Sequence, residues 1–89
     1  MAKKVAVLIR DNQGEGLRMA VGLTLADNEV SVFILDRVLE SDENNELNIE
    51  TLKDLGAKIF SNHPDNNFEQ ITTEELARLL PDYDVVIPY

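Results

Sequence analysis

Blocks of apolar and polar residues follow one another along the chain and predict strands and helices in alternation. Val5–Ile9 and Val30–Leu35 are almost unbroken apolar runs, and such runs are typical of strands buried on both faces of a parallel sheet. Between them, Glu15–Ala26 places its apolar residues at helical spacing. This part of the chain therefore predicts a strand, a helix and a second strand.

The middle of the chain predicts a second helix and a third strand between two polar loops. Leu47–Leu55 is a short amphipathic segment followed by Gly56, a residue suited to the left-handed backbone that often ends a helix. Ala57–Phe60 alternates more than the first two strands, as expected at a sheet edge. The polar stretches Asp36–Glu46 and Ser61–Gln70 are predicted to be loops, and the first is long enough to be functional or mobile.

The last part of the chain predicts a third helix and a fourth strand. Thr72 and Glu75 have the spacing of a capping box, which marks the amino end of a helix. Pro81 ends that helix, because proline cannot continue the hydrogen-bond pattern. Asp84–Tyr89 contains another apolar run and is the fourth predicted strand.

The predicted order βαβαβαβ indicates one α/β domain over residues 1–89, with three α/β/α layers around a four-stranded parallel sheet. The two continuous apolar strands belong in the centre, which favours the strand order 3-2-1-4. The direction of winding then reverses between strands one and four, and open α/β sheets bind ligands at such a point. The predicted crevice is lined by Pro88-Tyr89 and by the predicted ligand-binding residues Arg10, Asp11, Asn12, Gln13 and Gly14.

The first predicted helix carries two apolar stripes. The stripe expected to pack on the sheet is formed by Leu17, Ala20, Val21, Thr24 and Leu25. A second stripe on roughly the opposite side is formed by Met19, Leu23 and Ala26. A helix that is apolar on two sides usually has a cover on both, and in so short a chain a second subunit can supply one. The pattern therefore predicts a homo-oligomer that uses Met19, Leu23 and Ala26.

The composition narrows the classes of partner and chemistry. Seventeen acidic and eight basic residues give a net charge of −9, which argues against nucleic-acid binding and membrane association but not against a basic protein partner. The sequence has no cysteine, which excludes disulfides, thiolate metal sites and persulfide chemistry in this chain. No apolar run has the length of a membrane span or a signal peptide, and a cytoplasmic protein is therefore expected.

The crevice residues predict a ligand site with one cation. Arg10 follows a buried strand beside the amino end of a helix, where the dipole and the free amides attract anions. Glu15 weakens that attraction, so weak anion binding is expected. Gly14-Glu-Gly16 followed by Asp36 echoes a dinucleotide-binding fingerprint, but Met19 occupies its third small position.

The sequence predicts no metal, cofactor or catalytic centre. Asp11 and Asp36 follow the first two strands as in the acidic Mg²⁺ pocket of a receiver domain, but the remaining Asp and Lys of that pocket have no counterpart here. His63 is the sole histidine, and one histidine beside Asp65 is too few ligands for a metal site. The residues therefore favour a domain that is not an enzyme.

Three segments make the chain similar to the DsrE/DsrF-like family of small sulfur-relay proteins: Gly16–Leu35, Leu52–Phe60 and Thr73–Ile87. The resemblance implies a three-layer α/β/α fold, oligomeric assembly and a pocket at the strand ends. Active members carry persulfide on a cysteine just after the third strand. Here that neighbourhood reads Phe60-Ser-Asn-His-Pro64 and has no thiol.

Two functional hypotheses follow from these patterns. The first is a non-catalytic, oligomer-forming DsrE-like domain that binds a partner protein or a small ligand without persulfide transfer. The alternative is a small-molecule or nucleotide-binding module, or an enzyme, that uses the crevice at Arg10–Gly14.

Overall fold

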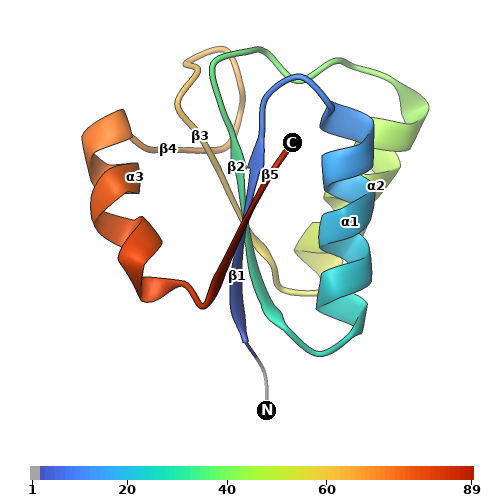
Figure 1. Ribbon diagram of the computed structural model, residues 1–89. Coiled ribbons are helices and arrows are strands. Elements are labelled where there is room, and N and C mark those ends of the chain that lie inside the picture. The colour runs from blue at the N-terminus through green and yellow to red at the C-terminus, as the bar shows by residue number, and fades with distance from the viewer. Residues whose placement is uncertain (1–2) are drawn as a thin grey trace.

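A parallel sheet of five strands runs through the middle of the computed structural model, which describes residues 3–89 (Figure 1). The spatial order is β4-β3-β2-β1-β5, and every pair of neighbours is parallel. The predicted domain began at residue 1, so its first two residues lie outside the described ones. The strands are β1 (Lys4–Ile9), β2 (Glu29–Ile34), β3 (Lys58–Ser61), β4 (Glu69–Gln70) and β5 (Val85–Pro88).

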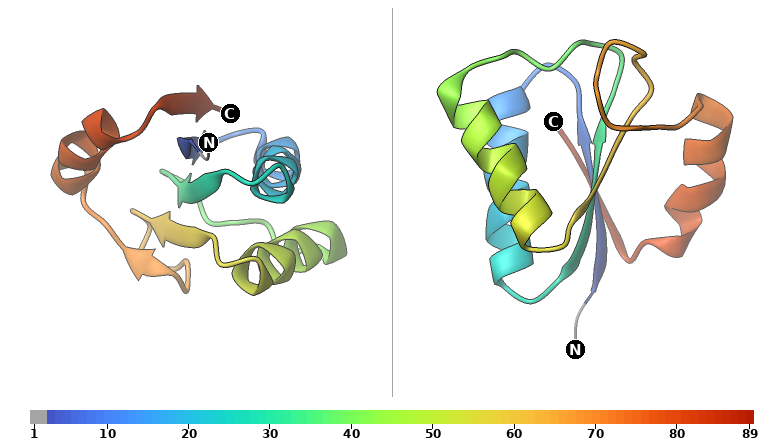
Figure 2. Two further views of the ribbon diagram at one scale, coloured as in Figure 1. Left: turned by 90° about the horizontal axis from the view of Figure 1, so that it is seen from below. Right: turned by 180° about the vertical axis from the view of Figure 1, so that it is seen from behind.

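Three helices flank the sheet: α1 (Gln13–Leu25), α2 (Glu43–Asp54) and α3 (Thr73–Leu79). Figure 2 shows α1 and α2 side by side on one face and α3 alone on the other. A short 3₁₀ helix, Leu80–Asp82, joins α3 to β5. The predicted α/β class with a parallel sheet is therefore confirmed.

The predicted number of four strands was wrong, because β4 adds a fifth strand outside β3. The four expected strands keep their relative order, but β3 is not the edge. Both β4 residues are polar and exposed, so this strand has no apolar alternation that a sequence pattern could reveal. Its backbone pairing with Phe60 and Ser61 alone defines it.

The central strands are buried on both faces, which explains their continuous apolar runs. Val7, Val32 and their neighbours at alternate positions pack under α1 and α2. Ala6, Leu8 and Phe33 point to the other face and pack with residues of the α3 region. The aromatic ring of Phe33 stacks on that of Phe60 with 5.1 Å between the ring centroids.

The ends of the helices follow local sequence features. The predicted capping box is present: Thr72 Oγ1 accepts from Glu75 N, and the Glu75 carboxylate accepts from Thr72 N, both at 3.1 Å. Gly56 has the predicted left-handed backbone, with φ of 85°. Gly16 has a packing role, because a Cβ there would lie 2.7 Å from Ile9 Cγ1.

Helix α2 begins earlier than the sequence pattern predicted. Asp42 is its N-cap and accepts from Asn45 N at 2.8 Å, so the predicted loop Asp36–Glu46 contains the first turn of the helix. The buried face is formed by Asn45, Ile49 and Leu52, whereas Leu47 is exposed. Because the first of these buried positions holds Asn45, whose side chain is an amide, the pattern of apolar residues did not indicate where the helix begins.

Helix α1 packs on the sheet through Leu17 and Ala20, as predicted, but Leu25 is 68% exposed and does not belong to that stripe. On the second stripe, Leu23 is half-buried and packs against the core. Met19 and Ala26 are exposed. Only part of the second stripe is therefore open to a partner.

Candidate functional site

The structure brings the predicted crevice residues together at the carboxyl end of β1. Arg10 and Asp11 follow the strand, Asn12 is the N-cap residue of α1, and Gln13 and Gly14 begin the helix. The backbone amides of Arg10 and Asn12 donate to the Tyr89 carbonyl oxygen at 3.1 and 3.3 Å. The loop is thus tied to the residue that follows β5.

The guanidinium group of Arg10 already has a carboxylate partner. Arg10 Nε donates to Asp36 Oδ2 at 2.9 Å, and Asn62 Nδ2 donates to Asp36 Oδ1 at 3.0 Å. The Asn62 and Arg10 hydrogen bonds lower the pKa of Asp36, since both stabilise the ionised carboxyl. Asp36 has a left-handed backbone, with φ of 69°. Both side chains of the ion pair remain about half exposed.

A second ion pair connects the same two loops, the one after β1 and the one after β2. Arg37 Nε lies 2.7 Å from Asp11 Oδ1, and both side chains are largely exposed. Exposed pairs of this kind contribute about 0.2–1 kcal/mol each. Both pairs connect the β1–α1 loop to the loop after β2.

Buried amide side chains hold the loop after β2 in place. Gln13 Nε2 donates to Val38 O at 3.1 Å, and Gln13 Oε1 accepts from Glu40 N at 2.9 Å. Asn45 Nδ2 donates to Glu40 O at 2.9 Å. These amides therefore satisfy loop backbone groups that have no strand or helix partner.

Asn66 completes this arrangement from the loop after β3. Its Oδ1 accepts from Leu39 N at 2.8 Å, and its Nδ2 donates to Arg37 O and Ser61 Oγ at 3.0 and 2.9 Å. We call Gln13, Asn45 and Asn66, all buried, the amide clamp. The sequence pattern indicated a functional or mobile loop here, whereas the contacts describe a loop fixed by three amides.

The hollow beside the predicted crevice is acidic. It has a volume of about 270 Å³ and contains four carboxylates and no cationic side chain; Arg10 is not part of its lining. Carboxylates repel anionic ligands, so the predicted anion site stays a prediction that this lining opposes. The lining residues are Asp11, Asn12, Gln13, Gly14, Glu15, Glu40, Asp42 and Asn45.

A larger cleft of about 590 Å³ lies between α2, the loop after β2 and the loop before β4. Val38, Leu39, Ile49 and Phe68 give it an apolar lining, and Val38 is 47% exposed. Its carboxylates form no ion pair within residues 3–89. They are Glu40, Glu46, Glu50 and Asp65; the lining also contains Lys53, whose Nζ lies 5.7 Å from the centroid of the Phe68 ring. Sequence reasoning missed this cleft, since its parts are far apart in the chain.

Ser61 occupies the neighbourhood in which the family resemblance expects a cysteine. It is fully buried at the end of β3. Its Oγ accepts from His63 N at 3.0 Å and from Asn66 Nδ2 at 2.9 Å. The hydroxyl is therefore part of the loop structure and has no access to a substrate.

No protein-family model matches the chain, and comparisons with curated proteins and with solved structures gave no match either. Within residues 3–89, no group of three or more His, Cys, Asp or Glu side chains is arranged to hold a metal ion. No helix in this described part is long and apolar enough to cross a membrane.

Proposed function

We propose that this chain is a non-catalytic, DsrE-like domain that assembles into a cytoplasmic homo-oligomer and transfers no persulfide. The absence of cysteine and the structural use of the Ser61 hydroxyl support the non-catalytic part. The order of helices around a parallel sheet supports the family resemblance. The proposal rests chiefly on the outer face of α1.

That face combines an exposed methionine with a glycine that the fold does not require. Met19 is 41% exposed, and a Cβ on Gly22 would meet no atom within 4 Å. Glycine inside a helix destabilises it by roughly 0.5–1 kcal/mol relative to alanine. Contact with another chain explains a glycine at this position, because the missing Cβ lets a second backbone or a large side chain come near.

The surroundings of Gly22 suit a second copy of the chain. Glu15, Arg18 and Tyr89 line a hollow of about 290 Å³ together with Met19 and Gly22. The charges of Glu15 and Arg18 balance there, whereas the whole chain carries −9, so this patch adds no net charge to a contact between two copies. A two-fold interface uses the same patch on both subunits. Burial of the exposed part of each Met19 offsets about 1 kcal/mol of the cost of association, because the side chain is 41% exposed.

Sedimentation equilibrium tests the proposal with single substitutions on exposed helix positions. We expect the wild type to be at least dimeric, and Met19→Glu or Gly22→Glu to weaken assembly by tenfold or more, about 1.4 kcal/mol. Leu47→Glu is the matched control, because it places the same charge at an exposed apolar position of α2. A wild type that stays monomeric at high concentration, or equal weakening by Leu47→Glu, contradicts the proposal.

A partner protein is a second candidate ligand, favoured by the cleft next to α2. Its apolar lining includes the exposed Val38, and its four carboxylates have no ion-pair partner among residues 3–89. A segment with lysine or arginine beside an apolar side chain complements such a surface.

A further inference from the structure

The cleft between α2, the loop after β2 and the loop before β4 continues into a second hollow. This hollow has a volume of about 320 Å³ and shares Lys53, Asn67 and Phe68 with the cleft. Ile59 and Glu69 extend its lining onto β3 and β4. We call the cleft and this hollow together the acidic groove. It reaches from the loop after β2 to the edge strand of the sheet.

Carboxylates outnumber cations in the acidic groove. Five carboxylates line it, against the ammonium group of Lys53. None of the five forms an ion pair within residues 3–89. They belong to Glu40, Glu46, Glu50, Asp65 and Glu69.

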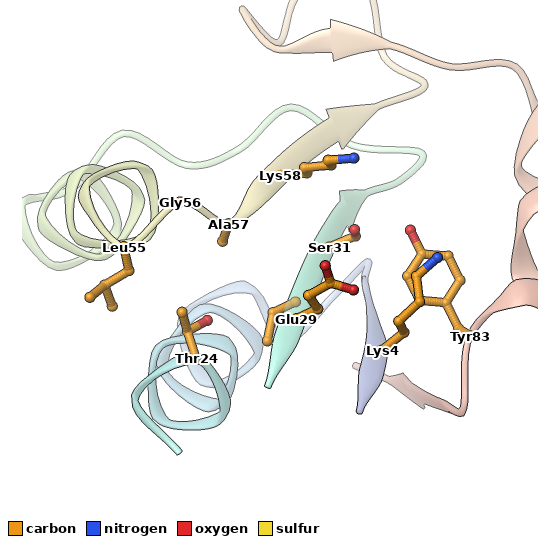
Figure 3. Close-up of a pocket in the computed structure, with 10 residues that line it drawn as sticks. Lys4, Thr24, Glu29, Ser31, Leu55, Gly56, Ala57, Lys58 and Tyr83 are labelled. Atoms are coloured by element: carbon orange, nitrogen blue, oxygen red, sulfur yellow. The ribbon is translucent and has the colours of Figure 1, made fainter. Parts of the chain in front are cut away.

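Two basic residues that adjoin the groove in the chain do not neutralise it. Arg37 precedes Val38, but its Nε lies 2.7 Å from Asp11 Oδ1. Lys58 precedes Ile59 but lines a different pocket, at the amino end of the sheet (Figure 3). Five carboxylates and one ammonium group therefore leave the groove with an excess of four negative charges.

Apolar side chains lie among these carboxylates. Val38, Leu39, Ile49 and Phe68 line the cleft, and Val38 is 47% exposed. Apolar surface beside unpaired carboxylates complements a partner that carries both apolar and basic side chains. The hollow lined by Glu15 and Arg18 lacks this combination, because its charges balance.

The ring of Phe68 already binds an alkylammonium group. Lys53 Nζ lies 5.7 Å from the ring centroid, within the range of cation–π attraction. Both residues line both hollows. Lys53 is therefore an internal competitor for any lysine or arginine that enters the groove.

A second copy of this chain does not supply a suitable segment. Its eight basic residues are spread along the sequence, and only Lys3 and Lys4 lie within four positions of each other. Val5, the apolar residue that follows them, is buried in β1. The occupant is therefore a different protein.

We propose that the acidic groove binds a short segment of another protein in which one apolar side chain lies between two basic ones. The apolar side chain packs on Val38 and Ile49, and the basic side chains pair with Glu50 and Asp65. Glu46 is less available, because its carboxylate accepts from Ser41 Oγ at 3.0 Å. This inference rests on the partner protein proposed above as the second candidate, and it is independent of self-association through α1.

Amide NMR titration of the whole chain with the peptide acetyl-Gly-Lys-Leu-Lys-Gly-amide tests the inference. We expect the largest shifts within residues 38–41, 46–53 and 65–69. The same peptide with serine in place of leucine keeps both charges and binds about tenfold more weakly, because it lacks the apolar side chain. Putrescine has the same charge and no branched apolar group, and it also binds about tenfold more weakly.

Substitutions in the groove change the affinity for the leucine peptide in two directions. Glu50→Gln and Val38→Ser each weaken binding about threefold, through loss of one exposed ion pair or of apolar contact. Lys53→Met tightens binding about threefold, because it removes a positive charge and the competitor for the Phe68 ring. Glu74→Gln on α3 and Lys3→Met are the matched controls, since they make the same charge changes outside the groove and leave the affinity unchanged.

The outcomes separate this inference from the proposals on which it builds. Equal affinity for the leucine and serine peptides, or for putrescine, overturns the basic–apolar–basic segment alone. Shifts centred outside the groove, or equal effects of Lys53→Met and Lys3→Met, overturn the groove as a partner site as well. Met19→Glu leaves the affinity for the peptide unchanged, so a failure of the proposed self-association is recognised separately.

Discussion

Asn66 shows how one polar side chain in this protein replaces a missing stretch of secondary structure. It reaches from the loop after β3 to backbone groups of Arg37 and Leu39 and to the Ser61 hydroxyl. An amide is suited to this position because it both donates and accepts. The loop after β2 therefore keeps its shape without strand partners.

Replacement of Asn66 should destabilise the fold markedly. Asn66→Ala leaves the partly buried N–H of Leu39 and carbonyl of Arg37 without their partner, and each such group costs up to about 1–3 kcal/mol. We expect a loss of about 2–4 kcal/mol in the free energy of unfolding measured with urea. Asn67→Ala is the control, because Asn67 is the exposed neighbour. Equal losses in the free energy of unfolding for the two substitutions would contradict this interpretation.

Asp36 gives a pH dependence whose sign follows from its environment. Its pKa is lowered in the folded state by Asn62 and Arg10, so it contributes stability above the ordinary carboxyl pKa, and that stability is lost as the pH falls through the lowered value. Wild type should exceed Asp36→Asn by about 0.2–1 kcal/mol near neutral pH, as for exposed pairs. The difference should vanish in strong acid.

Urea unfolding at several pH values measures this difference. Asp27→Asn is a close control, since Asp27 also has a left-handed backbone, with φ of 68°, and no ion pair within residues 3–89. A pH-independent difference between wild type and Asp36→Asn would show that the carboxyl contributes through geometry alone.

At the scale of the elements, α1 contains two glycines with opposite surroundings. Gly16 lies against Ile9 and Tyr89, whereas Gly22 has open space around it. Gly16→Ala should destabilise the fold by about 1–3 kcal/mol through overpacking. Gly22→Ala should stabilise the monomer by roughly 0.5–1 kcal/mol, because alanine is the better helix former. Thermal unfolding of dilute protein measures both effects, and equal signs would contradict the assigned roles.

Elements whose burial or capping is visible in a short run of residues could be predicted, and the others could not. β1 and β2 are buried on both faces and α3 has a local cap, so a few adjacent residues sufficed. β4 and the start of α2 depend on polar residues. The loop backbone groups that Gln13 and Asn66 bond after β2 are 25 to 29 positions away from them in the chain. No local pattern contains such pairings.

The place of the candidate loop in the fold was predictable, but the contacts of its side chains were not. The loop Arg10–Gly14 does lie at the carboxyl end of the sheet, as βαβ topology requires. The occupation of Arg10 by Asp36, 26 residues away, was not accessible from spacing. The pocket at the amino end of the sheet (Figure 3) was missed for a similar reason, because strand register brings Lys4, Glu29 and Lys58 into its lining.

At the scale of the whole molecule, the sheet is covered unevenly and its edges are short. The helices α1 and α2 cover one face and α3 covers the other (Figure 2). β4 has two residues, and β5 contains Pro88, which lacks a backbone N–H. Short strands and edge prolines discourage edge-to-edge pairing. Assembly through a helix face, as proposed for α1, is consistent with these edges.

The pairing of β1 with β5 joins segments about 80 residues apart, as between Lys4 and Asp84. Closing a ring of that size requires a large loss of chain entropy before any contact compensates for it. The folding nucleus is therefore expected among β1, α1 and β2, whose contacts are local, and β5 docks late. During translation, the edge of β1 that pairs with β5 therefore stays unpaired until residues 85–88 have left the ribosome. That exposed apolar strand is where a chaperone would act.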